Sequence, residues 1–332
     1  MRLFLSKTVL FAIPILLLPL LFYIIIDPFK VIFDYPEQIN TDKPYQITWN
    51  RDYQSTQLFL NNYKKYNYDS FILGNSMSFF YQVTTWEKYI DGNCIHFNAS
   101  NESLYGMWRK INLLDSLKVN IKNALIVINS NSLIGTQNSL GHLFIKHPTL
   151  SNESWFTFHA TMFKGFFPKP IFAFIDLFFT GKLKPYMYAY GIRNKVWKHD
   201  MVTNQISYYI YDQQIKENPE QFYADKMKLF VKRDTVQTYN KAVINGKRKI
   251  LLNNIKNVLK SHKTNYKIII SPLYDQIKFN RIELEYLKNL FGAENIFDFS
   301  GINNFTEDYH SFYEGAHYRP VVCDSILGII YM

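Results

Sequence analysis

Only two cysteines, Cys94 and Cys323, occur in the 332 residues. They are too few for a disulfide framework and lack the paired spacing of a zinc site, and the sequence does not say whether they bond to each other. Glycine and proline number only 13 and 12, and charged residues make up 19% against 48% hydrophobic. That balance excludes collagen-like and disordered chains and supplies enough apolar side chains for a packed core. Six histidines are scattered without metal-ligand spacing, so we expect no metal and no cofactor; they are His96, His142, His147, His159, His199 and His262.

The N-terminus carries one long apolar run. Residues 8–26 contain no charge, while Arg2 and Lys7 precede them and Asp27 follows. A helix over this run would be about 28 Å long, close to the thickness of a bilayer core. We therefore expect a single-pass membrane anchor at 1–27, a linker at 28–50 and an extracytoplasmic remainder. A cleaved signal peptide is the alternative, and it too would export the rest of the chain.

Basic residues outnumber acidic ones, with 37 Lys and Arg against 27 Asp and Glu and a formal net charge of +10. Nucleic acid is the obvious partner of a basic protein. Export argues against it, and the chain has no arginine-rich run. We expect instead a basic surface close to anionic lipids or glycans.

The rest of the chain alternates apolar runs with amphipathic stretches. The candidate strands are 69–74, 94–100, 124–130, 266–271 and 295–299. The candidate helices are 53–66, 103–118, 249–262, 282–291 and 320–331. This order predicts an α/β domain over 51–332 with a doubly wound, parallel, five-stranded sheet. In such sheets the ligand site lies at the carboxyl ends of the strands.

A long aromatic-rich insertion, about 135–246, separates the third strand from the fourth. Its most apolar part, 171–179, is too short to span a bilayer. Three interpretations remain open for this segment. It forms an interfacial helix that touches the membrane, a lid over the substrate, or a buried helix of an enlarged core.

Two chemical motifs lie at opposite ends of the domain. Ser76 follows the first strand in Gly74-Asn75-Ser76, where a nucleophile is exposed at the edge of a sheet. Near the C-terminus, Glu314 stands three residues before His317, so its carboxylate can hold the imidazole while the other ring nitrogen takes the serine proton. Each motif alone is common, a serine as a turn residue and a histidine beside an acid at the surface.

Other acids lie close to this histidine in the sequence. Asp298, and Asp308 with His310, are alternatives to Glu314. The spacing of three residues favours Glu314.

Together these motifs resemble the SGNH (GDSL-like) hydrolase family in their order: a serine after the first strand, Asn131 after the third, and an acid-x-x-His near the end. The resemblance covers most of 69–332 apart from the insertion, and implies a flavodoxin-like sheet. It also implies an oxyanion hole made by Asn131 and the backbone N–H groups of Ser76 and Ser103. The sequence departs from the family pattern in having Asn75 for Asp, Ser103 near an expected Gly, and Glu314 for Asp.

What the resemblance implies about function is acyl transfer. The expected protein is an anchored, extracytoplasmic serine esterase or O-acyltransferase of an acylated cell-envelope polysaccharide, in or near a membrane acyltransferase complex. Water as the second nucleophile gives an esterase, and a sugar hydroxyl gives a transferase. Two alternatives are a catalytically weak SGNH-like domain that binds glycans or acts as a scaffold, and a lipid-directed esterase that uses the apolar insertion.

Overall fold

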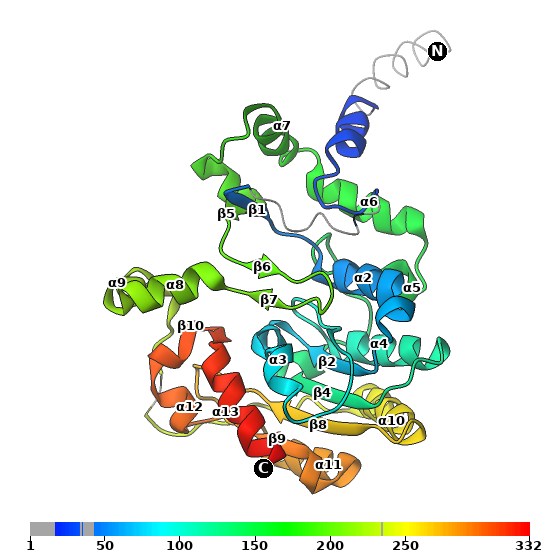
Figure 1. The fold of residues 1–332 in the computed structure, drawn as a ribbon, viewed down its shortest axis with the longest axis vertical. Coiled ribbons are helices and arrows are strands. Elements are labelled where there is room, and N and C mark those ends of the chain that lie inside the picture. The colour runs from blue at the N-terminus through cyan, green and yellow to red at the C-terminus, as the bar shows by residue number, and fades with distance from the viewer. Residues whose placement is uncertain (1–16, 34, 36–42, 234) are drawn as a thin grey trace.

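The computed structural model describes residues 17–33, 35, 43–233 and 235–332. Its centre is a parallel five-stranded sheet with the order β3-β2-β4-β8-β9 (Figure 1). The strands are β2 Ser70–Gly74, β3 Cys94–His96, β4 Asn123–Ile128, β8 Asn265–Ile270 and β9 Ile296–Asp298. All five lie where the apolar runs predicted them, and the parallel α/β sheet is confirmed.

Both faces of the sheet are covered, because successive side chains of a strand point to opposite sides. Phe71, Leu73 and Ile126 pack into one apolar cluster, and Ile72 and Leu125 into another. The first cluster contains α2 Arg51–Tyr66, α4 Leu104–Ser116, α10 Gly246–Ser261 and α11 Arg281–Phe291. The second contains α3 Val83–Trp86 and α13 Pro320–Tyr331. The sheet is therefore wound on both sides, as predicted.

Local sequence fixes where the long helices begin. Asn50 caps α2 by accepting the N–H of Tyr53, and Ser103 caps α4 by accepting the N–H of Gly106. Asn280 does the same for α11. Such caps each contribute about 1 kcal/mol to helix stability.

The insertion builds a separate layer beyond the sheet (Figure 1). Its helices are α5 Pro148–Ser151, α6 Trp155–Phe166, α7 Ile171–Thr180, α8 Tyr209–Glu217 and α9 Pro219–Lys226. Its strands are β5 Ile192–Asn194, β6 Lys198–His199 and β7 Ile206–Ser207. A third apolar cluster joins this layer to the residues that follow the N-terminal helix. It contains Phe174 of α7 together with Phe29 and Val31. The region predicted as a linker also contains a strand, β1 Tyr45–Ile47, which pairs antiparallel with β5.

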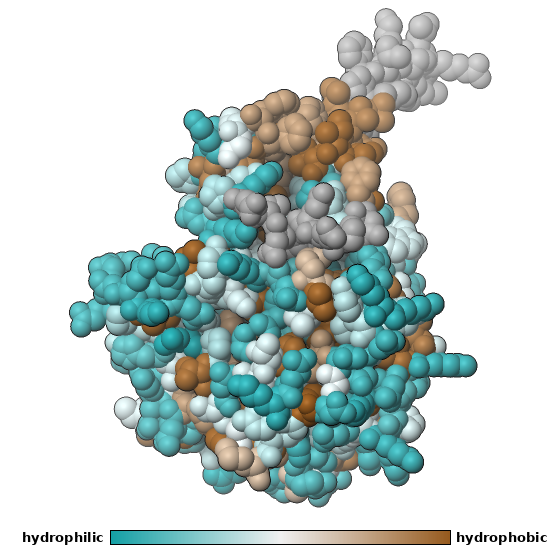
Figure 2. Space-filling model, in the orientation of Figure 1, coloured by the Kyte–Doolittle hydropathy of each residue, from teal (hydrophilic) through white to brown (hydrophobic). Residues whose placement is uncertain are grey.

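Helix α7 of the insertion has one buried face and one exposed face. Phe174 and Leu177 on one face are buried, whereas Phe172 and Phe179 on the other are 72% and 70% exposed. Figure 2 shows apolar surface gathered at the end of the molecule that carries α7 and the helix at 17–26. The buried face matches the core-helix interpretation, and membrane contact of the exposed face stays a prediction.

The predicted anchor, 8–26, is only partly described. Its residues 8–16 lie outside the described residues, and 17–26 are helical. Within the described ranges no helix is both long enough and apolar enough to cross a membrane. The anchor therefore stays a prediction.

Candidate active site

Ser76 stands just after the carboxyl end of β2, the strand between β3 and the central strand β4. The strand ends at Gly74, whose φ of +134° and close approach to the Val127 carbonyl leave no room for a side chain. Asn75 then caps the short 3-10 helix η1, Ser76–Phe80, by accepting the Met77 N–H at 3.1 Å. This sharp turn places Ser76 at the edge of the sheet where α/β folds bind ligands.

His317 reaches the same edge from the C-terminal end of the chain. Strands β10 Phe312–Glu314 and β11 His317–Tyr318 form an irregular antiparallel hairpin just before α13. The hairpin places Glu314 and His317 opposite each other. The ring of Phe80 packs edge-on against the imidazole, with centroids 5.6 Å apart.

The three side chains form one hydrogen-bonded chain. Ser76 Oγ lies 2.9 Å from His317 Nε2, and Glu314 Oε1 bonds to His317 Nδ1 on the other side of the ring. The His317 and Glu314 side chains are 22% and 24% exposed, so a substrate can reach the group. The structure thus brings together residues that are 241 positions apart in the sequence.

Electrostatics keep Glu314 ionised. Burial opposes its ionisation, but the hydrogen bond and charge of His317 and the N–H of Ala316 outweigh burial and lower the Glu314 pKa. A carboxylate that accepts from Nδ1 holds the proton on that nitrogen. Nε2 is then left as the acceptor for the Ser76 hydroxyl.

The two alternative acids have other partners. Asp298 forms an ion pair with Lys278 at 2.9 Å and accepts from Ser300. Asp308 bonds to His310 at 2.8 Å. Of the three candidates, Glu314 is the one hydrogen-bonded to His317.

The oxyanion-hole residues implied by the resemblance are only partly supported. The Ser103 N–H already donates to the buried Glu102 carboxylate at 3.1 Å, and the Ser103 hydroxyl caps α4. This N–H therefore already has an acceptor, and its role in an oxyanion hole stays a prediction. Ser76 is the first residue of η1, a position whose N–H has no acceptor within the helix, so its N–H remains suited to the role.

The role of Asn131 in the oxyanion hole also stays a prediction. Asn131 is exposed at the start of the 3-10 helix η2, Asn131–Leu133. Asn129 instead lies beside Asn75, with Asn75 Nδ2 to Asn129 Oδ1 at 3.5 Å, and also accepts the Ser132 N–H. The register accounts for this contact, because Gly74 pairs with Val127 near the ends of both strands and Asn75 and Asn129 follow directly after the two strands. Asn129 uses its oxygen in both contacts, which leaves its Nδ2 as a donor.

A buried network of hydrogen bonds holds the turn at Asn75 and Ser76 in place. Ser78 Oγ donates to the Asn75 carbonyl at 2.6 Å, and Asn98 Nδ2 donates to Ser78 Oγ at 2.9 Å. Asn98 also contacts His96 Nδ1 at 2.9 Å. These residues are all buried, and they fix the backbone that presents Ser76.

Three buried histidines make stability depend on pH. Burial, with the Arg51 charge for two of them, lowers the pKa of His96 and His199 to about 3, and burial lowers that of His147 to about 4. Unfolded histidine titrates near pH 6.5, so between these values the unfolded chain binds protons that the folded chain does not. Stability therefore falls as the pH drops from about 6.5 to 4, by up to about 1.4 kcal/mol per pH unit for each histidine.

Urea unfolding at pH 7 and pH 5 should show this loss. His147→Gln should make this pH dependence shallower, because it removes one of the buried histidines. Equal stability at the two pH values would contradict the prediction.

Within the described ranges, no group of three or more His, Cys, Asp and Glu side chains is placed to hold a metal ion. Comparison with known proteins adds no family: the chain matches no family model, no curated protein and no solved structure. The geometry of the site and the order of its motifs are thus the features that bear on function.

Proposed function

We propose that this protein is a serine esterase or O-acyltransferase that acts on an acylated glycan of the cell envelope. Ser76 is the nucleophile, His317 the general base, and Glu314 the residue that orients the imidazole. The observation that carries the proposal is the 2.9 Å contact between Ser76 Oγ and His317 Nε2, with Glu314 on the opposite nitrogen. A nucleophile, a base and an orienting acid in this order are the parts that acyl transfer requires.

The chemistry proceeds in two halves. Ser76 Oγ bonds to the ester carbonyl carbon while its proton moves to His317 Nε2. The tetrahedral intermediate collapses, the bond to the alcohol breaks, and the imidazolium gives its proton to the departing oxygen. Water or a sugar hydroxyl then attacks the acyl-serine, with His317 again as base, and releases an acid or a new ester.

The negative charge of the intermediate needs nearby donors. We infer that the Ser76 N–H and Asn129 Nδ2 are these donors, because Ser76 is the first residue of η1 and Asn129 lies beside Asn75. Loss of one such donor typically costs about a hundredfold or more in turnover.

We extend the proposal to family and location. The order of the motifs supports an SGNH-like hydrolase. The strand order supports a flavodoxin-like sheet, because β3 lies at the edge beside β2 and the later strands β4, β8 and β9 follow on the other side of β2. The apolar run at 8–26 supports a membrane-anchored, extracytoplasmic enzyme, alone or within an acyltransferase complex.

A second candidate function is a glycan-binding or scaffolding domain with little catalysis. One observation favours it: the Ser103 N–H, which the family pattern would use for the oxyanion, is occupied by Glu102.

A fluorophosphonate probe, which reacts with activated serines, distinguishes the two functions. The full-length protein in detergent should be labelled at Ser76, and Ser76→Ala should lose the label. Ser100→Ala, a matched change at a neighbouring serine, should keep it. A wild-type protein that resists labelling would contradict the enzyme and favour the binding domain.

A further inference from the structure

Beside the catalytic group lies a cavity of about 790 Å³ whose walls include Phe79, Tyr208 and Lys226. Tyr208 packs edge-on against Phe80 with centroids 5.1 Å apart, and Phe80 packs against His317. Two aromatic rings, Tyr208 in the cavity wall and Phe80 behind it, therefore lie between the cavity and the imidazole. This cavity is placed to bind a part of the substrate away from the reacting ester.

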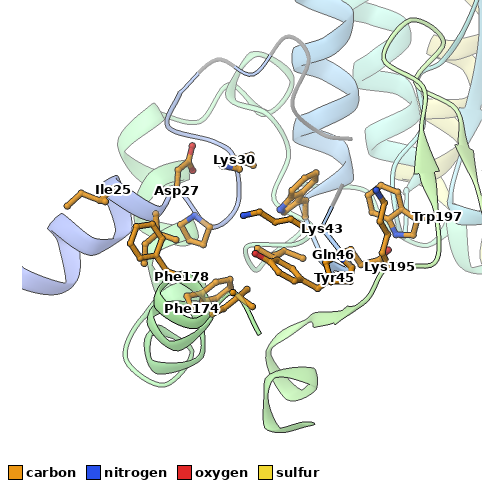
Figure 3. A pocket seen from close by; sticks show the side chains of 17 residues that line it. Ile25, Asp27, Lys30, Lys43, Tyr45, Gln46, Phe174, Phe178, Lys195 and Trp197 are labelled. Carbon is orange, nitrogen blue, oxygen red and sulfur yellow. The ribbon is translucent and has the colours of Figure 1, made fainter. Parts of the chain in front are cut away.

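A second cavity of about 490 Å³ adjoins the first. Four residues line both: Gln46, Trp49, Lys195 and Trp197. The second cavity extends toward α7 and the end of the helix at 17–26, where Phe178 and Ile25 line it (Figure 3). Together the two form a groove that leads from the catalytic edge toward the apolar end of the molecule.

Among the described residues that line this groove, all but one of the charged side chains are cationic. Six cationic residues line it: Lys30, Lys43, Arg51, Arg193, Lys195 and Lys226. Among the described residues that line the groove, Asp27 is the one carboxylate, and it accepts the backbone N–H groups of the turn that follows it, including that of Val31 at 3.0 Å. The groove therefore attracts anions along its length.

Aromatic side chains accompany the cations. Trp49 and Trp197 lie edge to face with centroids 6.5 Å apart, and the Lys226 ammonium lies 3.8 Å from the centroid of the Tyr211 ring. Amphipathic rings of this kind offer flat faces for stacking while the cations hold charged groups. The hydroxyl groups of a neutral sugar donate hydrogen bonds, and carboxylates are good acceptors for them. Asp27 is the one carboxylate among the described residues that line the groove.

We propose that this groove binds an anionic glycan, a sugar polymer that carries carboxylates or phosphates, and directs its acyl groups to Ser76. The inference rests on the proposed function for the role of Ser76, but binding itself needs no catalysis. The tryptophans stack on sugar rings, and Arg193 and Lys195 contact the charged substituents.

Binding is measured with the full-length Ser76→Ala protein in detergent by affinity electrophoresis. The probes are polygalacturonate for carboxylates, a phosphomannan for phosphates, and neutral dextran. We expect retardation by one or both anionic polymers but not by dextran, and weaker retardation as salt is raised. The double variant Arg193→Glu/Lys195→Glu should bind about tenfold more weakly or worse.

The matched control is Lys247→Glu/Lys260→Glu, which makes the same change in net charge on α10, on the other side of the molecule. It should bind about as tightly as the parent. Equal weakening by both double variants, or equal binding of dextran, would overturn the groove assignment. Fluorophosphonate labelling of the wild type separates the two proposals: labelling without polymer binding rejects the groove alone, and binding without labelling rejects the enzyme alone.

Discussion

Replacing His317 by glutamine should lower the hydrolysis of nitrophenyl acetate by about 10⁵- to 10⁶-fold, down to the rate left by binding and the oxyanion donors. The physical reason is the 2.9 Å contact between His317 Nε2 and Ser76 Oγ, through which the serine proton leaves. A glutamine amide cannot take that proton. Turnover of the activated ester by purified, full-length variants measures the loss.

Glu314→Gln should lose less, about 10⁴-fold, because the imidazole remains but its orientation and tautomer are no longer fixed by a carboxylate. His310→Gln and Asp308→Asn serve as matched controls, since they alter a second histidine and acid on the same stretch of chain that bond to each other. Both controls should retain wild-type turnover. A loss in the His310 variant comparable to that in the His317 variant would show that the wrong histidine was assigned.

The sheet could be predicted from sequence because its strands are short apolar runs bounded by polar residues. Runs such as 124–130 and 266–271 correspond to β4 and β8, which are buried on both faces in the centre of the sheet. Helix bounds were also close, because caps such as Asn50 and Asn280 are local signals. Only the ends of elements shifted by a few residues.

The hydrogen-bonded group of Ser76, His317 and Glu314 could be predicted for a related reason: each residue lies at an element end, and Glu314 and His317 are close in the chain. The contacts of the residues proposed for the oxyanion hole are harder to predict, because they depend on long-range packing. Ser103 was assigned by distance along the chain, but its N–H is taken by Glu102. Asn131 and Asn129 differ by two positions, and which of them contacts Asn75 depends on how the two strand ends meet, which a sequence does not display.

The insertion was the least predictable region. Its strand β5 pairs with β1, which precedes α2 in the sequence. No local pattern signals a pairing between segments so far apart in the chain. Its Lys146 enters a buried cluster with three residues of the domain, Asp52, Glu102 and Lys110. The sequence shows four ordinary charged residues there, and only the fold shows that they meet.

That cluster predicts a large effect on stability. Lys146 Nζ lies 2.9 Å from Asp52 and 2.6 Å from Glu102, and Lys110 Nζ lies 3.2 Å and 2.6 Å from the same two carboxylates. All four side chains are at most 3% exposed. Two cations and two anions thus balance in the interior.

Lys146→Met should lower the free energy of unfolding by about 3–5 kcal/mol, because it leaves one buried lysine to compensate two carboxylates. Urea unfolding at pH 7 measures the change. Lys122→Met is the matched control: Lys122 pairs with Asp91 at 2.6 Å, but both side chains are exposed, so water replaces the lost partner. The control should leave stability unchanged.

A second variant separates charge balance from packing. In Lys146→Met/Asp52→Asn, one cation and one anion are removed together, so the pair Lys110 and Glu102 remains balanced and part of the lost stability should return. Burial raises the Asp52 pKa, but Lys110 and Lys146 outweigh burial and lower it below the usual value near 3.9. The contribution of Asp52 is therefore present above that value and lost as the pH falls through the lower folded pKa. A double variant less stable than Lys146→Met would show that the lysine acts through packing rather than through charge.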